Sequence, residues 1–353
     1  MFMFKSTLLI SALVSTATAT LPIYTLTDNF VGPSFLSGFN WEAIPDPTHG
    51  AVNYTDQAFA IQQNLTFTSH DTLILRADST HTTNYPTGPG RNSVRIRSNK
   101  LYSNTVTIMN LRHMPVGCGT WPAFWSTLEA DWPDSGEVDI IEGVNDVSPN
   151  LSSLHTSANC TMVASTMSQT GNIVSADCYG GDNNGAGCGI QATKANSYGP
   201  PLNSIGGGWY AMERTAQHIN IWFWGRDEKG VPVDVLLGSP IVDPSLWGTP
   251  TANFVSTNCD FATHFGPHNI IINLTLCGDW AGNVYPSTCP STCIDHVNND
   301  PAAFVDAYWD IASVKVFEPV NITIPTVSIP KIPIPTGHVK HRRARDHGRS
   351  HLL

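Results

Sequence analysis

The chain repeats one pattern, in which short apolar runs are separated by stretches rich in turn-forming residues. Seven runs of six to nine residues are rich in β-branched or aromatic side chains, and they lie at residues 72–77, 93–98, 104–111, 136–141, 218–224, 269–277 and 311–317. Some alternate in polarity, so that Val94 and Ile96 should face one way and Arg95 and Arg97 the other. Amphipathic helical patterns are nearly absent, and residues 304–309 allow one helical turn at most. The pattern predicts an all-β sandwich with long loops.

Composition agrees with a large globular β protein. Ten Trp and 14 Phe can form a sizeable core, which excludes disorder over most of the length. A chain of 353 residues permits two domains, but a sandwich of this size can also be one domain. The formal net charge of −10 argues against nucleic acid as a partner, because nucleic-acid-binding domains are usually basic.

The N-terminal residues have the pattern of a secretory signal peptide. Lys5 is the only charge in the first 27 residues, and it is followed by an apolar stretch at 8–14 and small residues at 17–19. We expect residues 1–19 to be removed by cleavage after Ala19, with a buried N-terminal strand as the alternative. The apolar stretch is too short for a membrane span, which needs about 20 residues. A secreted, extracellular protein without a membrane span is therefore expected.

The C-terminal residues, 319–353, differ in composition from the predicted body at 20–318. Residues 322–335 are spaced by Pro, which favours an extended, polyproline-like backbone. From Pro319 onward there are six basic residues and one acidic residue. We expect a disordered tail, whose charge is compatible either with binding to an acidic surface or with a solvated terminus.

Sequons and cysteines point to the same compartment. Six Asn-X-Ser/Thr sequons, each a candidate for N-glycosylation, lie at Asn53, Asn64, Asn150, Asn159, Asn273 and Asn321. An even number of Cys, eight in this chain, favours disulfides in a secreted protein. Zinc binding is the weaker alternative, because paired short Cys spacings are lacking. Cys289 and Cys293 are close enough in sequence to close a small local loop.

Three carboxylates lie within six residues in the segment Gly-Glu-Val-Asp-Ile-Ile-Glu-Gly at 136–143. On a regular strand Glu137 and Asp139 share a face, and Glu142 points to the opposite one. A one-residue bulge at Ile140 and Ile141 would return Glu142 to the shared face. Cleavage of a glycosidic bond with retention of configuration uses two carboxyl groups about 5–5.5 Å apart, one as nucleophile and one as acid/base. A third carboxyl between them would interact with both.

Spacing alone also allows a solvated acidic face or a calcium site. The surrounding aromatic residues favour a sugar site, because sugar rings pack on aromatic faces. Trp121, Trp125 and Trp132 precede the cluster, and Trp280 lies in a Gly-flanked loop after a predicted strand. For any single Trp a place in the core is about equally plausible. His155 follows the cluster and could pair with a substrate or a carboxyl group, although a lone His is more often structural.

The acidic motif resembles the active-site signature of glycoside hydrolase family 16, in the bulged form E-x-D-x-x-E that is typical of laminarinases. The likeness extends to secreted fungal (basidiomycete-type) laminarinase-like endo-1,3(4)-β-glucanases and covers residues 21–317. The segments that carry it are residues 91–98, 112–125, 131–146, 196–200, 206–214, 269–282 and 307–317.

This resemblance implies a β-jelly-roll sandwich of two curved antiparallel sheets, with a substrate groove on the concave face. It implies that Glu137 is the nucleophile, Glu142 the acid/base and Asp139 the assisting carboxylate. The positions expected to contact glucosyl units are Trp121, Trp125, Trp132 and Trp280, with Arg95 and His155 at polar subsite positions. The family requires no cofactor or catalytic metal, and a structural calcium, which some relatives bind, has no assignable ligands in the sequence.

We therefore expect a monomeric, retaining endo-hydrolase whose partner is a β-glucan with β-1,3 or mixed β-1,3/1,4 linkages. Repulsion by Asp139 and Glu137 should raise the pKa of the acid Glu142. A transglycosylase with the same residues is the first alternative. A glucan-binding lectin would typically lack one of the two catalytic Glu residues, and a carrageenan- or agarose-active enzyme would favour a basic groove.

Overall fold

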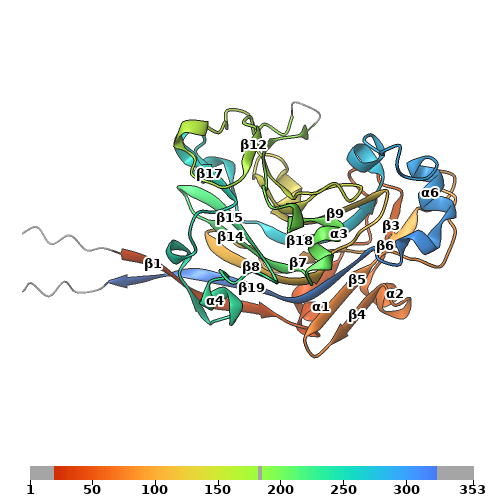
Figure 1. Ribbon diagram of the computed structural model, residues 1–353, viewed down its shortest axis with the longest axis horizontal. Coiled ribbons are helices and arrows are strands. Elements are labelled where there is room, and N and C mark those ends of the chain that lie inside the picture. The colour runs from red at the N-terminus through yellow and green to blue at the C-terminus, as the bar shows by residue number, and fades with distance from the viewer. Residues whose placement is uncertain (1–19, 182–184, 324–353) are drawn as a thin grey trace, which may run out of the picture. The chain divides into compact units, whose positions relative to one another are not determined.

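The computed structural model describes residues 20–181 and 185–323, and residues 21–321 form one compact unit. Two antiparallel sheets pack against each other (Figure 1). The predicted all-β sandwich is therefore confirmed. The predicted signal peptide at 1–19 and residues 324–353 of the predicted tail lie outside the described residues.

One sheet has nine strands. Its main path is β16 (Ile241–Val242), β1 (Thr20–Phe30), β19 (Tyr308–Thr323), β8 (Thr105–His113), β14 (Gly208–Arg214), β15 (His218–Gly225) and β17 (Ala252–Val255), while β5 (Thr72–Arg76) pairs with β19 and β4 (Thr66–Ser69) pairs with β5. All seven apolar runs predicted to be strands overlap strands of this sheet or of its partner. Residues 304–309 contain no more than a helical turn, as expected: the 3-10 turn η8 covers Pro301–Phe304, and β19 begins at Tyr308.

The other sheet has eight strands. Their order is β12 (Asn172–Ser175), β13 (Cys188–Gln191), β11 (Leu151–His155), β10 (Glu137–Glu142), β9 (Thr120–Thr127), β18 (Asn269–Leu276), β7 (Arg95–Ser98) and β2 (Phe39–Trp41). Two short strands, β3 (Val52–Tyr54) and β6 (Arg91–Ser93), pair in parallel at one side.

Helices among the described residues are short. The α-helices are α1 (Ser34–Gly38), α2 (Gln57–Gln62), α3 (Gly199–Ser204), α4 (Val233–Leu236), α5 (Phe261–His264) and α6 (Cys293–Asn299). The other turns are η1 (Glu129–Asp131), η2 (Ala164–Thr166), η4 (Ala195–Ser197), η5 (Pro244–Leu246), η6 (Ser256–Asn258) and the π-turn η7 (Gly278–Gly282). No helix in these described ranges is long and apolar enough to cross a membrane.

The main core lies between the two sheets. Met109 and Tyr210 of the nine-stranded sheet belong to one buried cluster with Phe124, Val138 and Ile272 of the eight-stranded sheet. Because side chains alternate along a strand, residues next to these core positions point to the opposite face of the eight-stranded sheet. That face is therefore free to form a site.

Four of the ten Trp pack away from that face. Trp209, Trp222, Trp224 and Trp247 form a second buried cluster on the nine-stranded sheet. For these residues the core interpretation of a Trp is correct.

Four disulfides link segments of the sandwich, two of them across long stretches of sequence and two across short ones. The pairs are Cys118–Cys289, Cys160–Cys259, Cys178–Cys188 and Cys277–Cys293. All eight Cys are paired, which confirms the disulfide prediction and excludes the zinc alternative. The suggested local loop from Cys289 to Cys293 is wrong, because each bonds to a different strand end.

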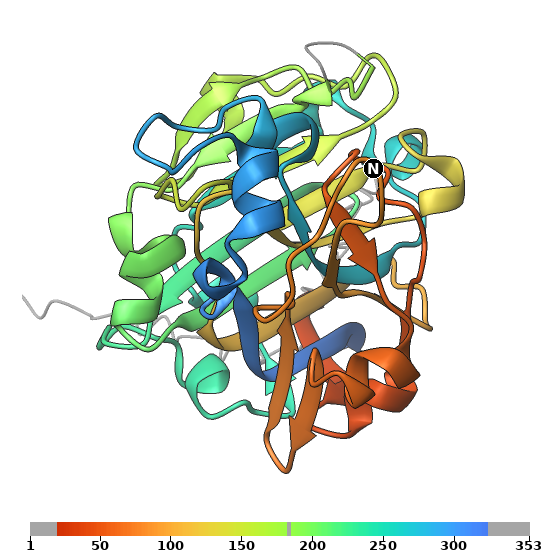
Figure 2. The ribbon, with the colours of Figure 1, turned by 90° about the vertical axis from the view of Figure 1, so that its right-hand side faces the viewer.

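In Figure 2 the helix α6, in blue, lies beside the orange N-terminal segments, and Arg91 donates to the carbonyl of Val297 in this helix.

Candidate active site

The three carboxylates project from one face of β10 because the strand contains a bulge. Asp139 is paired with Trp125 of β9, and the next β9 residue, Phe124, is paired with Ile141. One extra residue is therefore inserted in β10 after Asp139, as predicted. The side chains of Val138, Ile140 and Ile141 are buried in the core. Glu137, Asp139 and Glu142 line the groove on the opposite face.

An indole N–H donates to each of the two outer carboxylates. Trp132 Nε1 donates to Glu137 Oε2 at 2.8 Å, and Trp121 Nε1 donates to Glu142 Oε1 at 2.9 Å. These bonds restrict the rotamers of the two carboxylates, because each aligns one carboxylate oxygen with an indole N–H. The strand and its two indoles therefore hold both Glu side chains in place.

His155 faces the same carboxylates from the neighbouring strand. It is paired across the ladder with Glu137, and its Nε2 atom lies 3.1 Å from Asp139 Oδ2 and 3.8 Å from Glu137 Oε1. The side chain of Asp139 is 2% exposed, so His155 is its principal charged neighbour of opposite sign. The structure thus brings His155 to the carboxylates rather than into the core.

The groove has a volume of about 1150 Å³ and runs across the eight-stranded sheet. Every predicted site residue lines it: Arg95, Trp121, Trp125, Trp132, Glu137, Asp139, Glu142, His155 and Trp280. Trp132 is 47% exposed at the rim. Trp121 and Trp280 meet edge to face, with their ring centroids 5.6 Å apart. A surface of this kind, with exposed aromatic faces beside paired carboxylates, suits a sugar chain.

The chain matches known proteins over this whole sandwich. A family model described as the XgeA-like, catalytic GH16 domain matches residues 39–317. The chain belongs to glycoside hydrolase family 16. The family assignment confirms the resemblance found in the sequence, and with it the jelly-roll fold and the class of enzyme.

Solved structures of this family resemble the chain closely. GH16 laminarinase 16A from Phanerochaete chrysosporium, determined with two β-glucans in its donor and acceptor sites, is 57% identical and covers 84% of this chain and 100% of its own, with a TM-score of 0.82. An elongating family 16 β-1,3-glucosyltransferase is 40% identical, with the same coverage of both chains and a TM-score of 0.77.

Fungal relatives agree with this assignment. A probable glycosidase of Schizosaccharomyces pombe is 40% identical over 84% of this chain and 69% of its own length. A probable endo-1,3(4)-β-glucanase of Neosartorya fischeri is 42% identical over 84% of this chain but 46% of its own length. The chain thus spans about half the length of that glucanase. This family 16 domain is similar to endo-1,3(4)-β-glucanases.

Burial shapes the acid–base properties of the family 16 site. Burial raises the pKa of Glu142 to about 7, and repulsion by Glu137 adds to this effect. The direction agrees with the prediction, but burial is the largest cause, and of the two predicted neighbours Glu137 contributes the repulsion while Asp139 does not. Burial also raises the pKa values of Glu137 and Asp139, which repel neighbouring carboxylates. Burial alone would lower the pKa of His155, but pairing with Asp139 and the charges of the carboxylates raise it to about 10.

Arg95 lies in the groove wall and is almost fully engaged within the protein. Its side chain is 4% exposed, and it pairs with Glu42 and with Glu129. Its guanidinium also lies over the ring of Trp125, 5.0 Å from the centroid, while Trp125 Nε1 donates to Asn273 Oδ1 at 2.8 Å. The geometry gives Arg95 a clear role in fixing Trp125.

Glu137, Asp139 and His155 are also the described residues whose ligand atoms come close enough to share an ion, all within 4.8 Å. Calcium prefers six to eight oxygen ligands, so a set with one nitrogen and two carboxylates fits it poorly. This trio is therefore a poor calcium site, and the structural calcium expected from some relatives stays a prediction.

Sequence reasoning missed several polar residues of the groove. They are Asp46, Thr48, Glu129, Ser153, Asn273, Thr275, Asp279 and Asn283. Asn273 and Thr275 could have been found, because both alternate with core residues along the predicted strand at 269–277. Asp46 and Thr48 lie in a loop without strand periodicity, so their position had no signal in the sequence.

Proposed function

We propose that this chain is a secreted, retaining endo-β-glucanase that hydrolyses β-1,3 and mixed β-1,3/1,4 glucans such as laminarin. One observation carries the proposal: Glu137 and Glu142 lie on the same face of one bulged strand, in a groove lined with Trp. The similarity to endo-1,3(4)-β-glucanases and to a laminarinase supports the substrate class.

In the proposed first step, Glu137 attacks the anomeric carbon while Glu142 donates its proton to the leaving oxygen. The bond from the anomeric carbon to this oxygen breaks, and a glycosyl ester forms on Glu137. The N–H of Trp132 and the positive charge of His155 stabilise the ionised form of Glu137 that this attack requires. Burial raises the pKa of Glu142 to about 7 and that of Glu137 to about 8, so the pair holds a proton near neutral pH, and the attack requires this proton to be on Glu142.

In the second step, Glu142 removes a proton from a water molecule, which attacks the same carbon and releases Glu137. Asp139 lies between the two Glu residues on the strand. Its negative charge, held against His155, disfavours a second negative charge nearby, so the cluster retains a proton for Glu142 to use.

The roles of the two Glu residues can be tested with azide and an activated aryl β-glucoside oligomer. In Glu142→Ala the good leaving group needs no acid, so azide should attack the glycosyl ester and give a β-glycosyl azide. In Glu137→Ala azide should replace the nucleophile itself and give an α-glycosyl azide. NMR of the product distinguishes the two, and the reversed pattern would refute the assignment of roles.

The substrate class is tested by mass spectrometry of products from laminarin, barley mixed-linkage glucan and xyloglucan. Short oligomers from the first two support the proposal, and products from xyloglucan alone would refute it. A second function, transglycosylation, is favoured by the 40% identity to an elongating β-1,3-glucosyltransferase. Products longer than the donor in the presence of an added oligosaccharide acceptor would identify it.

Secretion is proposed from the predicted signal at 1–19 and is supported by four disulfides, which form and persist in oxidising compartments. Expression in a fungal host, followed by N-terminal sequencing of the protein in the medium, tests it. A mature N-terminus at Thr20 is expected, and retention inside the cell would contradict secretion.

A further inference from the structure

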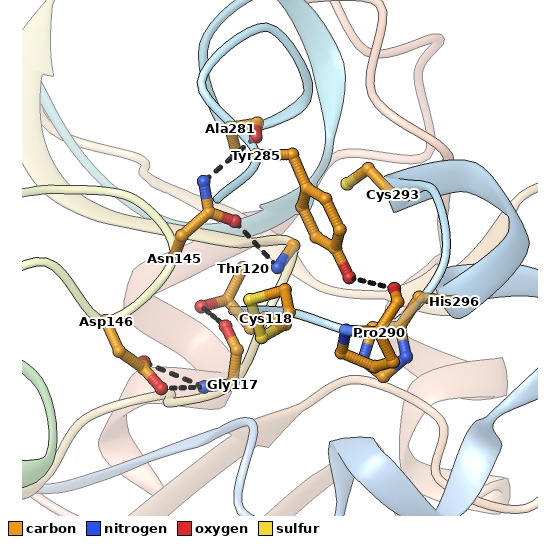
Figure 3. Close-up of a disulfide and its surroundings, with 12 residues drawn as sticks. Gly117, Cys118, Thr120, Asn145, Asp146, Ala281, Tyr285, Pro290, Cys293 and His296 are labelled. Carbon is orange, nitrogen blue, oxygen red and sulfur yellow. Dashed lines mark hydrogen bonds between the residues drawn. A yellow bond between two sulfur atoms is a disulfide. The ribbon is translucent and has the colours of Figure 1, made fainter. Parts of the chain in front are cut away.

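The turn that carries Trp280 is joined to the catalytic strand by one buried amide. The Trp280 turn comprises residues 277–284, and its indole meets that of Trp121 at the groove. Asn145, three residues after Glu142, is 6% exposed and lies between the turn and the start of β9 (Figure 3). Its Nδ2 atom donates to the carbonyl of Ala281 at 2.9 Å, and its Oδ1 atom accepts from the N–H of Gly119 at 2.8 Å.

The two disulfides nearby fix the ends of this region but not the turn itself. Cys277–Cys293 ties the start of the turn to α6, and Cys118–Cys289 ties the following segment to the start of β9. Trp280 lies between these points. Ala281 is fully buried, so its carbonyl would lose a buried hydrogen bond without the amide of Asn145.

A side chain with both a donor and an acceptor is needed at this position. The backbone N–H of Asn145 also donates to the carbonyl of Thr120 at 3.0 Å, so the residue bonds to the first residue of β9, next to Trp121, and to Gly119 just before it. Trp121 in turn donates to Glu142. Asn145 therefore links the turn that carries Trp280 to the start of β9, next to Trp121.

We propose that Asn145 is a positioning residue that sets the Trp280 face of the groove and, through it, the affinity for glucan chains. This proposal rests on the proposed function for its substrate. Asn145 touches no reacting atom, so its loss should act on substrate binding more than on the chemical step.

The test is Asn145→Asp, which keeps the size and the acceptor for Gly119 but places a carboxylate oxygen against the Ala281 carbonyl. The matched control is Asn203→Asp, away from the groove. Asn203 likewise accepts from the N–H of Met114 and donates to its carbonyl, both at 2.9 Å. Both variants should lower the melting temperature, but only Asn145→Asp should raise KM for laminarin oligosaccharides, by about three- to tenfold, which corresponds to the loss of one aromatic contact. Its kcat should change less.

A double-mutant cycle separates positioning from a purely structural role. Trp280→Ala alone should raise KM to a similar extent, and adding Asn145→Asp to it should have little further effect, because both act through the same ring. Full additivity, or an unchanged KM in Asn145→Asp, would overturn the proposal. If the wild-type enzyme cleaved no β-glucan, the proposed function would fail instead.

A measurement without substrate distinguishes failure of the proposed role of Asn145 from failure of the proposed function. In protein labelled with 5-fluorotryptophan, the resonance of Trp280 is assigned by its absence in Trp280→Phe. We expect it to shift or broaden in Asn145→Asp and to remain unchanged in Asn203→Asp. An unchanged Trp280 resonance in Asn145→Asp would overturn the role of Asn145 whatever the activity.

Discussion

Removal of the indole N–H from Glu142 should make this carboxyl a weaker acid. Trp121→Phe keeps an aromatic ring in the groove but deletes the donor that lies 2.9 Å from Glu142 Oε1. This hydrogen bond stabilises the ionised carboxylate and so lowers its pKa. A hydrogen bond to a charged group contributes about 1.5–3 kcal/mol, and about 1.4 kcal/mol corresponds to one pKa unit. Because water can reach part of this site, we expect the hydrogen bond to contribute the lower end of this energy range. The pKa of Glu142 should therefore rise by about one unit.

The assay is direct titration of the carboxyl groups by NMR. The chain contains seven Glu residues, so protein labelled with carboxyl-¹³C glutamate gives a simple spectrum. The resonances of Glu137 and Glu142 are assigned from their Gln variants. In the wild type Glu142 should titrate near the value of about 7 that burial gives it. If Glu142 is the proton donor, activity is lost as pH rises through its pKa, so the alkaline limb of kcat/KM should move upward in Trp121→Phe.

Trp132→Phe is the matched control, because it removes the equivalent donor from Glu137 at 2.8 Å. It should raise the pKa of Glu137 and leave that of Glu142 nearly unchanged. The reasoning is refuted if Trp121→Phe leaves the pKa of Glu142 unchanged or lowers it. If the pKa of Glu142 measured by NMR rises but the alkaline limb of kcat/KM does not move, the effect of the hydrogen bond is supported. The role of Glu142 as the proton donor is then refuted.

Three further predictions concern the body of the protein. N-glycans should occupy the exposed Asn53, Asn64 and Asn159 but not the buried Asn150 and Asn273, because a glycan at a buried Asn would prevent folding. Peptide mapping of the folded, secreted protein checks this prediction, and a glycan on Asn273 would contradict it. Loss of Cys118–Cys289, with a sequence separation of 171, should cost about 5 kcal/mol of unfolding free energy, against about 3 kcal/mol for Cys178–Cys188 with a separation of 10. Denaturant unfolding of the two double Cys-to-Ser variants compares them, and equal losses would contradict the entropic account. Phe124→Ala should lower the free energy of unfolding by about 3–5 kcal/mol in the same assay, because this fully buried ring lies between the sheets. A loss below about 1 kcal/mol would contradict this prediction and show that the core closes around the cavity.

The strands could be predicted from the sequence because their periodicity is local. The alternation put Glu137 and Asp139 on one face of β10, and the position of Glu142 on that face required a bulge that the structure contains. The six-residue motif therefore predicted both the local geometry and the residues that share a face. Disulfide partners had no such local signal, because Cys118 and Cys289 meet only when distant segments pack.

Arg95 shows where a periodic pattern stops being informative. The alternation of the strand placed Arg95 on the groove face, opposite Ile96, and it does line the groove. Alternation says nothing, however, about the acidic partners that come from elsewhere in the chain, Glu42 before it and Glu129 after it. A buried guanidinium costs several kcal/mol unless it is paired, so these partners decide whether Arg95 is available to a substrate.

The paired charges of the groove fit the neutral sugar chain that the proposed function requires. Arg95 is neutralised by Glu42 and Glu129, and His155 by Asp139, so the buried cations are paired within the protein. A neutral polysaccharide brings no charge to compensate an unpaired group, and it would lose affinity if it had to break such pairs. In the proposed function its hydroxyl groups and apolar ring faces would instead meet indoles and amides, such as those of Trp125 and Asn273, which bond to each other beside Arg95. Substrate binding and ionisation are thus separated by geometry, because the free carboxyl chemistry is confined to Glu137 and Glu142.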